Sequence, residues 1–290
     1  MDFFTGKELL QRCHDESIPI SEVMRMRELT NTQRSEENIA QKLETVLTIM
    51  KNAAHKPIES PGKSIGGLIG GEAKKVTDHA LAGKSICGSV LSKAIAYSMA
   101  VLEVNASMGL IVAAPTAGSA GVLPGVLLAL QDEQKLSDDR MYKGLLNASA
   151  IGYLLMRNAS VAGAEAGCQA EVGAASAMAA SAIVEMMGGT PEMCLTAATF
   201  ALSNLLGLVC DPIAGLVESP CQSRNAIGVA NAITSAELAL SGIPHHIPFD
   251  EMAEAMLRVG RSLPFELRET AMGGCAGTPT GCALGCSICK

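Results

Sequence analysis

The chain has 290 residues, of which 48% are hydrophobic and 18% charged, and its net charge is −7 with a pI near 5.3. This hydrophobic content excludes a disordered protein, and the acidic balance without a stripe of Lys and Arg argues against binding to nucleic acid. Aromatic residues are only 3%, Trp is absent and Gly numbers 29, so we expect a core of Ala, Leu, Ile, Val and Met between closely approaching backbones.

The first sixty residues are polar and helical in pattern, and we interpret residues 1–60 as an amphipathic entry segment. Thr5 to Glu8 matches a capping box, and Ser21 is placed to cap a second helix. One apolar helical face follows, formed by Ile39, Leu43, Val46, Leu47 and Met50. The charged N-terminus lacks the apolar core of a secretion signal, which predicts a cytoplasmic protein.

Pro and Gly interrupt the helical pattern in KPIESPGKSIGGLIGG, residues 56–71, where we place a boundary. We interpret residues 61–274 as an apolar helical catalytic core and 275–290 as a Cys-rich tail. Ser137 and Thr190 stand where helix caps are expected, and Pro191 suits a first turn. The core should contain helices at 78–108, 122–132, 138–158, 162–188, 191–209, 223–241 and 249–262. Strand signals are weak, so we predict an all-α fold.

Two local patterns resemble a membrane-spanning helix and a phosphate-binding loop, but the surrounding sequence supports neither interpretation. The 18 uncharged residues between Glu192 and Asp211 approach the length of a membrane span. Ser203 and Asn204 make this stretch too polar to face lipid, so we expect it in the protein interior. The tripeptide GKS at 62–64 lacks both the earlier Gly and the preceding strand of a phosphate-binding loop.

The ten cysteines are better candidates for thiolate chemistry, metal ligation or burial than for disulfides, because we expect a reducing compartment. Cys168, Cys210 and Cys221 each lie at a break in a helical run, where a thiolate can project into a shared cavity. Three ligands would leave one metal coordination position open to a substrate. Three others in helical patterns are interpreted as core or surface thiols: Cys13, Cys87 and Cys194.

The tail cysteines Cys282, Cys286 and Cys289 have the spacing Cys-x3-Cys-x2-Cys, which also occurs in radical enzymes that hold an iron–sulfur cluster. That motif belongs early in an α/β barrel, whereas here it ends a helical chain. A zinc knuckle with Cys275 as fourth ligand is a second interpretation, although its spacing fits no common pattern. The tail taken alone therefore leaves its role open.

The segment APTAGSAGVLPG, residues 114–125, leads into an apolar helix. Unpaired backbone amides at such a helix start suit a carboxylate or phosphate ligand. The alternative is a sharp turn between two helices, which the local sequence favours.

Four stretches together resemble the α chain of the iron–sulfur L-serine dehydratases over nearly the whole chain: APTAGSAGVLPG, EAGCQAEVGAASAMAA, LGLVCDPIAGLVESPCQSRNA and RETAMGGCAGTPTGC. The resemblance implies an all-helical catalytic unit with an oxygen-sensitive [4Fe–4S] cluster that converts L-serine to pyruvate and ammonia. It places three cluster ligands at Cys168, Cys210 and Cys221. In single-chain relatives a C-terminal Cys reaches back to the cluster, and its counterpart here is Cys282, followed by Cys286 and Cys289.

The resemblance also implies a partner and a mechanism. Nothing here matches the additional N-terminal domain of single-chain relatives, so we expect a separate β chain that completes the active site. An exposed iron would act as a Lewis acid on the serine hydroxyl while a base removes the α-proton. Candidate contacts for the substrate carboxylate are Thr116, Gly118 and Ser119, with Arg224 and Asn225 as weaker candidates. The base is not identified, because the five histidines lie on polar stretches or in a Pro-flanked loop.

Two alternatives remain. A pyridoxal-phosphate dehydratase performs the same reaction with a Schiff-base Lys on an α/β fold, but Lys84 and Lys93 lack that context. A non-catalytic metal-binding subunit is supported only by the cysteines of the tail. The sequence does not distinguish serine from threonine as the substrate. The two differ by one methyl group, which changes the binding free energy by only about 1–3 kcal/mol.

Overall fold

The computed structural model describes residues 2–31 and 34–288, and within these ranges it contains thirteen α-helices and no β-strand. The prediction of an all-α fold is confirmed. The helices are α1 Gly6–Glu16, α2 Ile20–Asn31, α3 Glu36–Glu59, α4 Glu72–Leu81, α5 Gly88–Ala106, α6 Val122–Gln134, α7 Asp138–Asn158, α8 Gly163–Ala166, α9 Ala174–Met186, α10 Pro191–Asn204, α11 Cys221–Leu240, α12 Phe249–Ser262 and α13 Pro279–Ile288. Three short turns accompany them: π-helical η1 Gln169–Gly173 and 3₁₀-helical η2 Ile213–Gly215 and η3 Phe265–Leu267.

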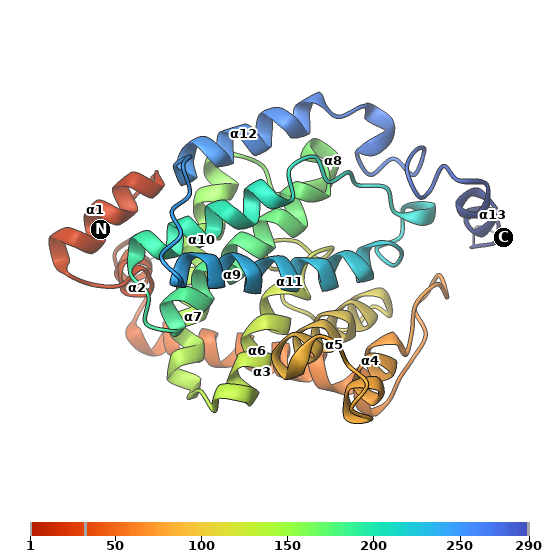
Figure 1. Ribbon diagram of the computed structural model, residues 1–290, viewed down its shortest axis with the longest axis horizontal. Coiled ribbons are helices and arrows are strands. Elements are labelled where there is room, and N and C mark those ends of the chain that lie inside the picture. Colours follow the sequence, from red (N-terminus) through yellow and green to blue (C-terminus); the bar gives the residue numbers. More distant parts are fainter. Residues whose placement is uncertain (1, 32–33, 289–290) are drawn as a thin grey trace.

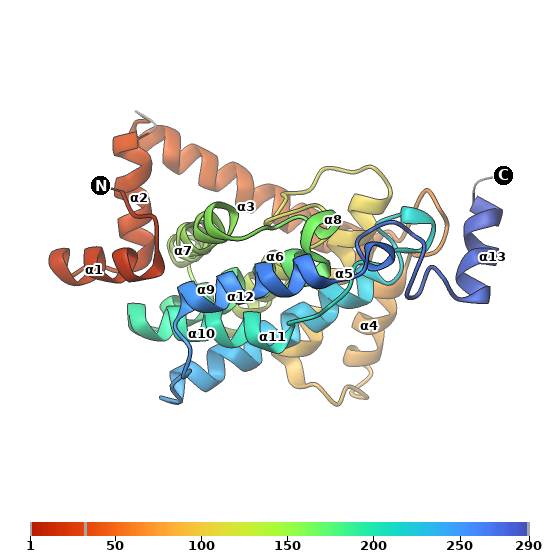
Figure 2. The same cartoon turned by 90° about the horizontal axis from the view of Figure 1, so that it is seen from above.

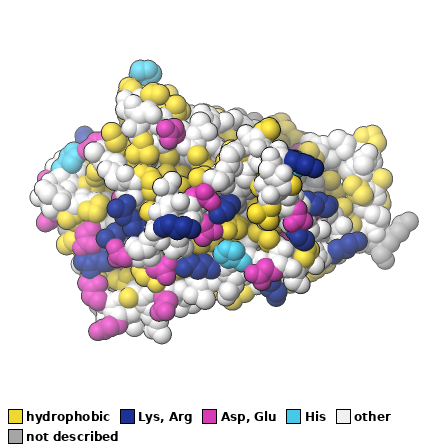
Figure 3. Space-filling view, turned by 60° about the horizontal axis from the view of Figure 1, so that its bottom comes forward, with side chains coloured by type: hydrophobic (Ala, Val, Ile, Leu, Met, Phe, Trp, Pro, Cys, Tyr) yellow, Lys and Arg dark blue, Asp and Glu magenta, His cyan; other side chains and the backbone are white. Residues whose placement is uncertain are grey.

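The helices form an elongated bundle with α1 at one end and α13 at the other (Figures 1 and 2). Helix α9 lies in its interior and packs against α6, α7, α10 and α11, while α12 covers α8 and α10. On the face shown in Figure 3, acidic and basic side chains are interspersed, with hydrophobic side chains between them. No helix among the described residues has the length and apolar character needed to cross a membrane.

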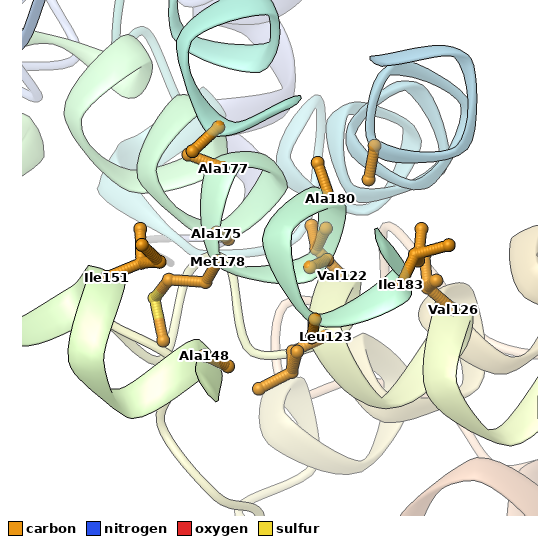
Figure 4. Close-up of a cluster of buried hydrophobic side chains, with 14 of the residues drawn as sticks. Val122, Leu123, Val126, Ala148, Ile151, Ala175, Ala177, Met178, Ala180 and Ile183 are labelled. Atoms are coloured by element: carbon orange, nitrogen blue, oxygen red, sulfur yellow. The ribbon is translucent and has the colours of Figure 1, made fainter. Parts of the chain in front are cut away.

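Small side chains allow α9 to occupy this interior position. Twelve of its thirteen residues are buried, and most are Ala or Ser. Figure 4 shows Ile151 of α7 and Val122 of α6 beside Met178 and Ala180 of α9. At Gly152 of α7 an added Cβ would lie 3.0 Å from the Met178 Cε atom, so the missing side chain is what lets the two helices approach. The composition thus predicted the character of the core correctly.

The helix caps follow local sequence chemistry at three of the four predicted positions. The Thr5, Ser137 and Thr190 hydroxyls each accept a hydrogen bond from the backbone amide three residues on, which satisfies an otherwise unpaired donor. The predicted cap at Ser21 is wrong, because α2 already begins at Ile20 and Ser21 is buried in its first turn.

Two predicted helices are divided in the structure. The expected helix at 78–108 is wrong as a single element, because Gly83 and Gly88 adopt φ values of 69° and 66° between α4 and α5. The expected helix at 162–188 is interrupted at Gly167, where φ is 75°. A left-handed residue cannot continue a right-handed helix, so the chain turns at these glycines. Helix α13 in the tail was not predicted.

Candidate active site

The three cysteines at helix breaks lie together in the structure. Cys168 directly precedes η1, Cys210 follows α10 and Cys221 is the first residue of α11. Their exposed fractions are only 3%, 3% and 6%. The side chains of Cys168 and Cys210 are hydrogen-bonded to each other, and the charge of Cys168 acts on Cys221.

The backbone around these cysteines is held by contacts between distant segments. The Cys210 amide donates to the Leu267 carbonyl at 2.9 Å, and the Glu269 amide donates to the Cys210 carbonyl at 2.7 Å. These bonds form an isolated parallel bridge between Cys210 and Arg268. Cys221 is the first residue of the 20-residue helix α11.

The three thiols form a donor set that suits an iron–sulfur cluster. Hydrogen bonding to Cys168 raises the pKa of Cys210 far above its ordinary value, and burial followed by the charge of Cys168 raises the pKa of Cys221 to about 12. These raised pKa values mean that ionising the thiols in the protein alone costs free energy. Metal binding offsets that cost, because the metal charge stabilises the coordinated thiolate. The described residues contain no compact group of three His, Cys, Asp or Glu for a single metal ion. A [4Fe–4S] cluster does not require one, since its cysteines bind different irons.

A carboxylate that the sequence analysis missed, Glu171, lies beside the cysteines. The Thr116 hydroxyl donates to its Oε1 atom at 2.6 Å, and Cys210 Sγ lies 3.8 Å from its Oε2 atom. Burial raises the pKa of Glu171, opposed by the Thr116 hydrogen bond, and Glu269 adds to the increase. Glu171 lies on η1, and π-helical turns often mark functional sites. The sequence could have indicated Glu171, because it is the only charged residue in the apolar stretch 166–184.

The loop predicted to contact substrate runs along the same site. Thr116 and Ser119 hydroxyls lie 3.2 Å apart. The fully buried Asn225 accepts from the Gly121 amide at 3.0 Å and donates to the carbonyls of Gly118 and Cys221 at 2.8 and 2.9 Å. The side-chain amide of Asn225 therefore connects the loop with the start of α11 through hydrogen bonds.

Arg224 connects the cysteines with the tail. Its guanidinium pairs with the buried Asp211 at 2.6 Å, donates to the Val209 carbonyl at 2.8 Å and is hydrogen-bonded to Cys168. Burial lowers the pKa of Arg224, but the charges of Cys168 and Asp211 outweigh burial and the pKa is raised. Asp211 also accepts a hydrogen bond from the Cys275 amide at 2.6 Å. The first cysteine of the tail is thereby tied to the site.

The remaining predicted residues lie further along the tail or elsewhere. Cys282 and Cys286 are exposed residues of α13, which packs against η2. Among the described residues neither shares a hydrogen bond with the three buried cysteines; Cys282 Sγ lies 3.4 Å from the Ala276 carbonyl. Cys289 lies outside the described residues. The described histidine hydrogen bonds join His14 to Glu192, His55 to Lys51 and His245 to Ile247.

Comparison with known proteins identifies relatives over most of the chain. Residues 15–276 match the family described as "Serine dehydratase alpha chain". The "L-serine dehydratase, alpha chain" of Peptoniphilus asaccharolyticus is 47% identical over 277 residues, covering 96% of this chain and 95% of that protein. The "Probable L-serine dehydratase, alpha chain" of Bacillus subtilis is also 47% identical, over 279 residues that cover 96% and 93%. The "L-serine dehydratase" of Helicobacter pylori is 35% identical over 282 residues, which cover 96% of this chain but 62% of that protein.

Proposed function

Because this chain belongs to the serine dehydratase alpha chain family, we propose that it is the α subunit of an L-serine dehydratase, a lyase that forms pyruvate and ammonia. The observation that carries the proposal is the convergence of Cys168, Cys210 and Cys221 beside the loop that contains Thr116. Thiols from three separate helix ends would gain little by meeting in a core unless they bind a common group.

We propose that these three cysteines hold a [4Fe–4S] cluster. When bound, such a cluster supplies a Lewis acid for the hydroxyl group that leaves the substrate. The interaction of Cys168 with both Cys210 and Cys221 supports this assignment, since it brings the three thiols to one place. Cys282 stays our candidate for the tail thiol that approaches the cluster.

The residues of this chain would bind and orient the substrate. Thr116, Gly118 and Ser119 lie in the loop just before α6, where loop amides can donate to a carboxylate. Arg224 lies beside Cys168 and keeps its positive charge there. We assign Asn225 to holding the loop, because its polar atoms are already used within the protein.

We propose that a separate β chain completes the site and that the enzyme acts in the cytoplasm. The names of the two most similar relatives reported above specify an alpha chain, and the longer Helicobacter relative has one chain of which this protein covers 62%. No described histidine contacts the three cysteines through a hydrogen bond, so a group from the partner is a reasonable source of the base that removes the α-proton.

The test is anaerobic purification of this chain together with its partner, followed by measurement of pyruvate formed from L-serine. We expect activity that is lost after exposure to oxygen and an iron chelator. Activity that survives this treatment and requires pyridoxal phosphate would establish the alternative dehydratase chemistry. Iron binding without any pyruvate formation would indicate a non-catalytic metal-binding subunit.

A further inference from the structure

In the part of the chain that the structure describes, Glu171 forms no direct ion pair, although the charge of Arg224 acts on its carboxyl group. Its two contacts are neutral: the Thr116 hydroxyl at 2.6 Å and the weak thiol donor Cys210 at 3.8 Å. The nearby Arg224 is committed to Asp211 at 2.6 Å. A carboxylate withdrawn from water ordinarily requires a compensating charge. The site therefore leaves a place for a cation that the fold itself does not provide.

The backbones of two glycines lie directly against this carboxylate. A Cβ at Gly118 would lie 2.9 Å from Glu171 Oε1, and a Cβ at Gly163 would lie 2.6 Å from Oε2. Neither position could accept even Ala without displacing the carboxylate, because real Cβ contacts are longer than this. Glu171 itself is not fully buried. The partial exposure of Glu171, on the side that the glycines do not cover, leaves it accessible to a small ligand.

We propose that Glu171 binds the α-ammonium group of the substrate amino acid. The inference rests on the proposed function and deepens it, because an amino acid carries its ammonium and carboxylate groups on one carbon atom. Anchors for the two groups must therefore be neighbours. The proposed anchors are neighbours here, because Thr116 of the carboxylate-binding loop donates a hydrogen bond of 2.6 Å to Glu171, the proposed ammonium-binding residue.

The test compares two ligands that differ only in the ammonium group. L-Alanine and propionate both lack the hydroxyl that leaves in the reaction, so their equilibrium binding to the anaerobic enzyme with its partner chain can be measured by calorimetry. Glu171→Gln should weaken L-alanine binding by roughly 10- to 100-fold, as expected for a charged hydrogen bond, and leave propionate binding unchanged. Glu171→Asp should retain part of the preference for L-alanine, since it keeps the charge.

Glu165→Gln is the matched control, because Glu165 is exposed, pairs with Arg261 and lies on α8, which packs against the turn η1 that contains Glu171. It should bind both ligands as the unmodified enzyme does. The inference is overturned if Glu171→Gln binds L-alanine normally, or if Glu171→Asp loses the preference for L-alanine completely. These outcomes are distinct from failure of the proposed function, which would appear as an unmodified enzyme that forms no pyruvate from L-serine.

Discussion

At the scale of single residues, the buried cysteines of the site differ from those of the core in what surrounds them. Contact with Cys168 raises the pKa of Cys210, whereas burial and the charge of Glu185 raise the pKa values of Cys13 and Cys194. Three thiols that interact suit a shared metal group, while Cys13 and Cys194, whose pKa values are set mainly by burial, behave as small apolar side chains. Burial alone therefore does not identify a ligand.

The first prediction uses this contrast. Replacing Cys210 with Ala should lower iron and inorganic sulfide in the anaerobic protein to a small fraction of the normal content and abolish serine turnover, because a cluster ligand is lost. Cys194→Ala, which removes an equally buried thiol outside the site, should retain both. Full iron and sulfide in Cys210→Ala would show that this cysteine is not a ligand.

The second prediction concerns Cys13 and alkaline pH. Its pKa is raised from 9.0 to about 12 in the folded protein, so the folded state holds the thiol proton more tightly than the unfolded state does. This stabilisation is complete below pH 9 and is lost as the pH rises toward 12, by up to about 1.4 kcal/mol per pH unit. Urea unfolding should be measured at pH 8 and pH 10. Between these two pH values, the free energy of unfolding should fall by about 1 kcal/mol less in Cys13→Ala than in the unmodified chain. Equal losses would contradict the assignment.

At the scale of helices, the sequence predicted elements well where their ends are set locally. The helix at 138–158 was predicted with its observed bounds, because Ser137 caps it within three residues. The expected helix at 162–188 failed at Gly167, since nothing nearby showed that this glycine would adopt a positive φ. Glu171 was missed for a similar reason: its partner Thr116 is 55 residues away in sequence. The family resemblance predicts Cys168, Cys210 and Cys221 as candidate ligands, but the sequence analysis did not identify the carboxylate beside them.

Close helix packing gives the third prediction. A Cβ at Gly125 of α6 would lie 2.8 Å from the Ala94 carbonyl and 2.9 Å from the Ser98 Cβ atom of α5. Gly125→Ala should therefore destabilise the chain by about 1–3 kcal/mol, although Ala is normally the better helix former. Gly285→Ala in α13, where the nearest atom is 3.7 Å away, should be neutral in the same denaturation experiment. A stabilised Gly125→Ala variant would contradict the packing argument.

The fourth prediction concerns the Gly-rich segment 64–69. Glu218 is buried three residues before Cys221 and accepts hydrogen bonds from the Ser64 hydroxyl at 2.6 Å and from the amides of Gly66 and Leu68 at 2.7 and 3.0 Å. Glu218→Ala removes all three bonds, so hydrogen exchange at these amides should accelerate at least tenfold. The exposed substitution Glu237→Ala should leave their exchange rates unchanged. Unchanged exchange in Glu218→Ala would show that other contacts hold the segment.

At the scale of the whole molecule, the proposed site lies among segments that are widely separated in sequence. The segment around η2 and the tail helix α13 lie at one end of the bundle, far from α1 (Figures 1 and 2). The amide of Cys275 binds Asp211, and Asp211 pairs with Arg224, so the tail, a loop and α11 meet there. At this end of the bundle the tail therefore converges with two segments that are far from it in sequence.

We propose that Cys168, Cys210 and Cys221 hold a four-iron cluster with one iron left for the substrate. Mössbauer spectroscopy of the anaerobic enzyme loaded with ⁵⁷Fe tests this directly. We expect one quarter of the signal to change when L-serine is added, because only the iron without a cysteine ligand can bind it. A cluster signal that L-serine leaves unchanged, or a preparation that is active without any cluster signal, would contradict the account.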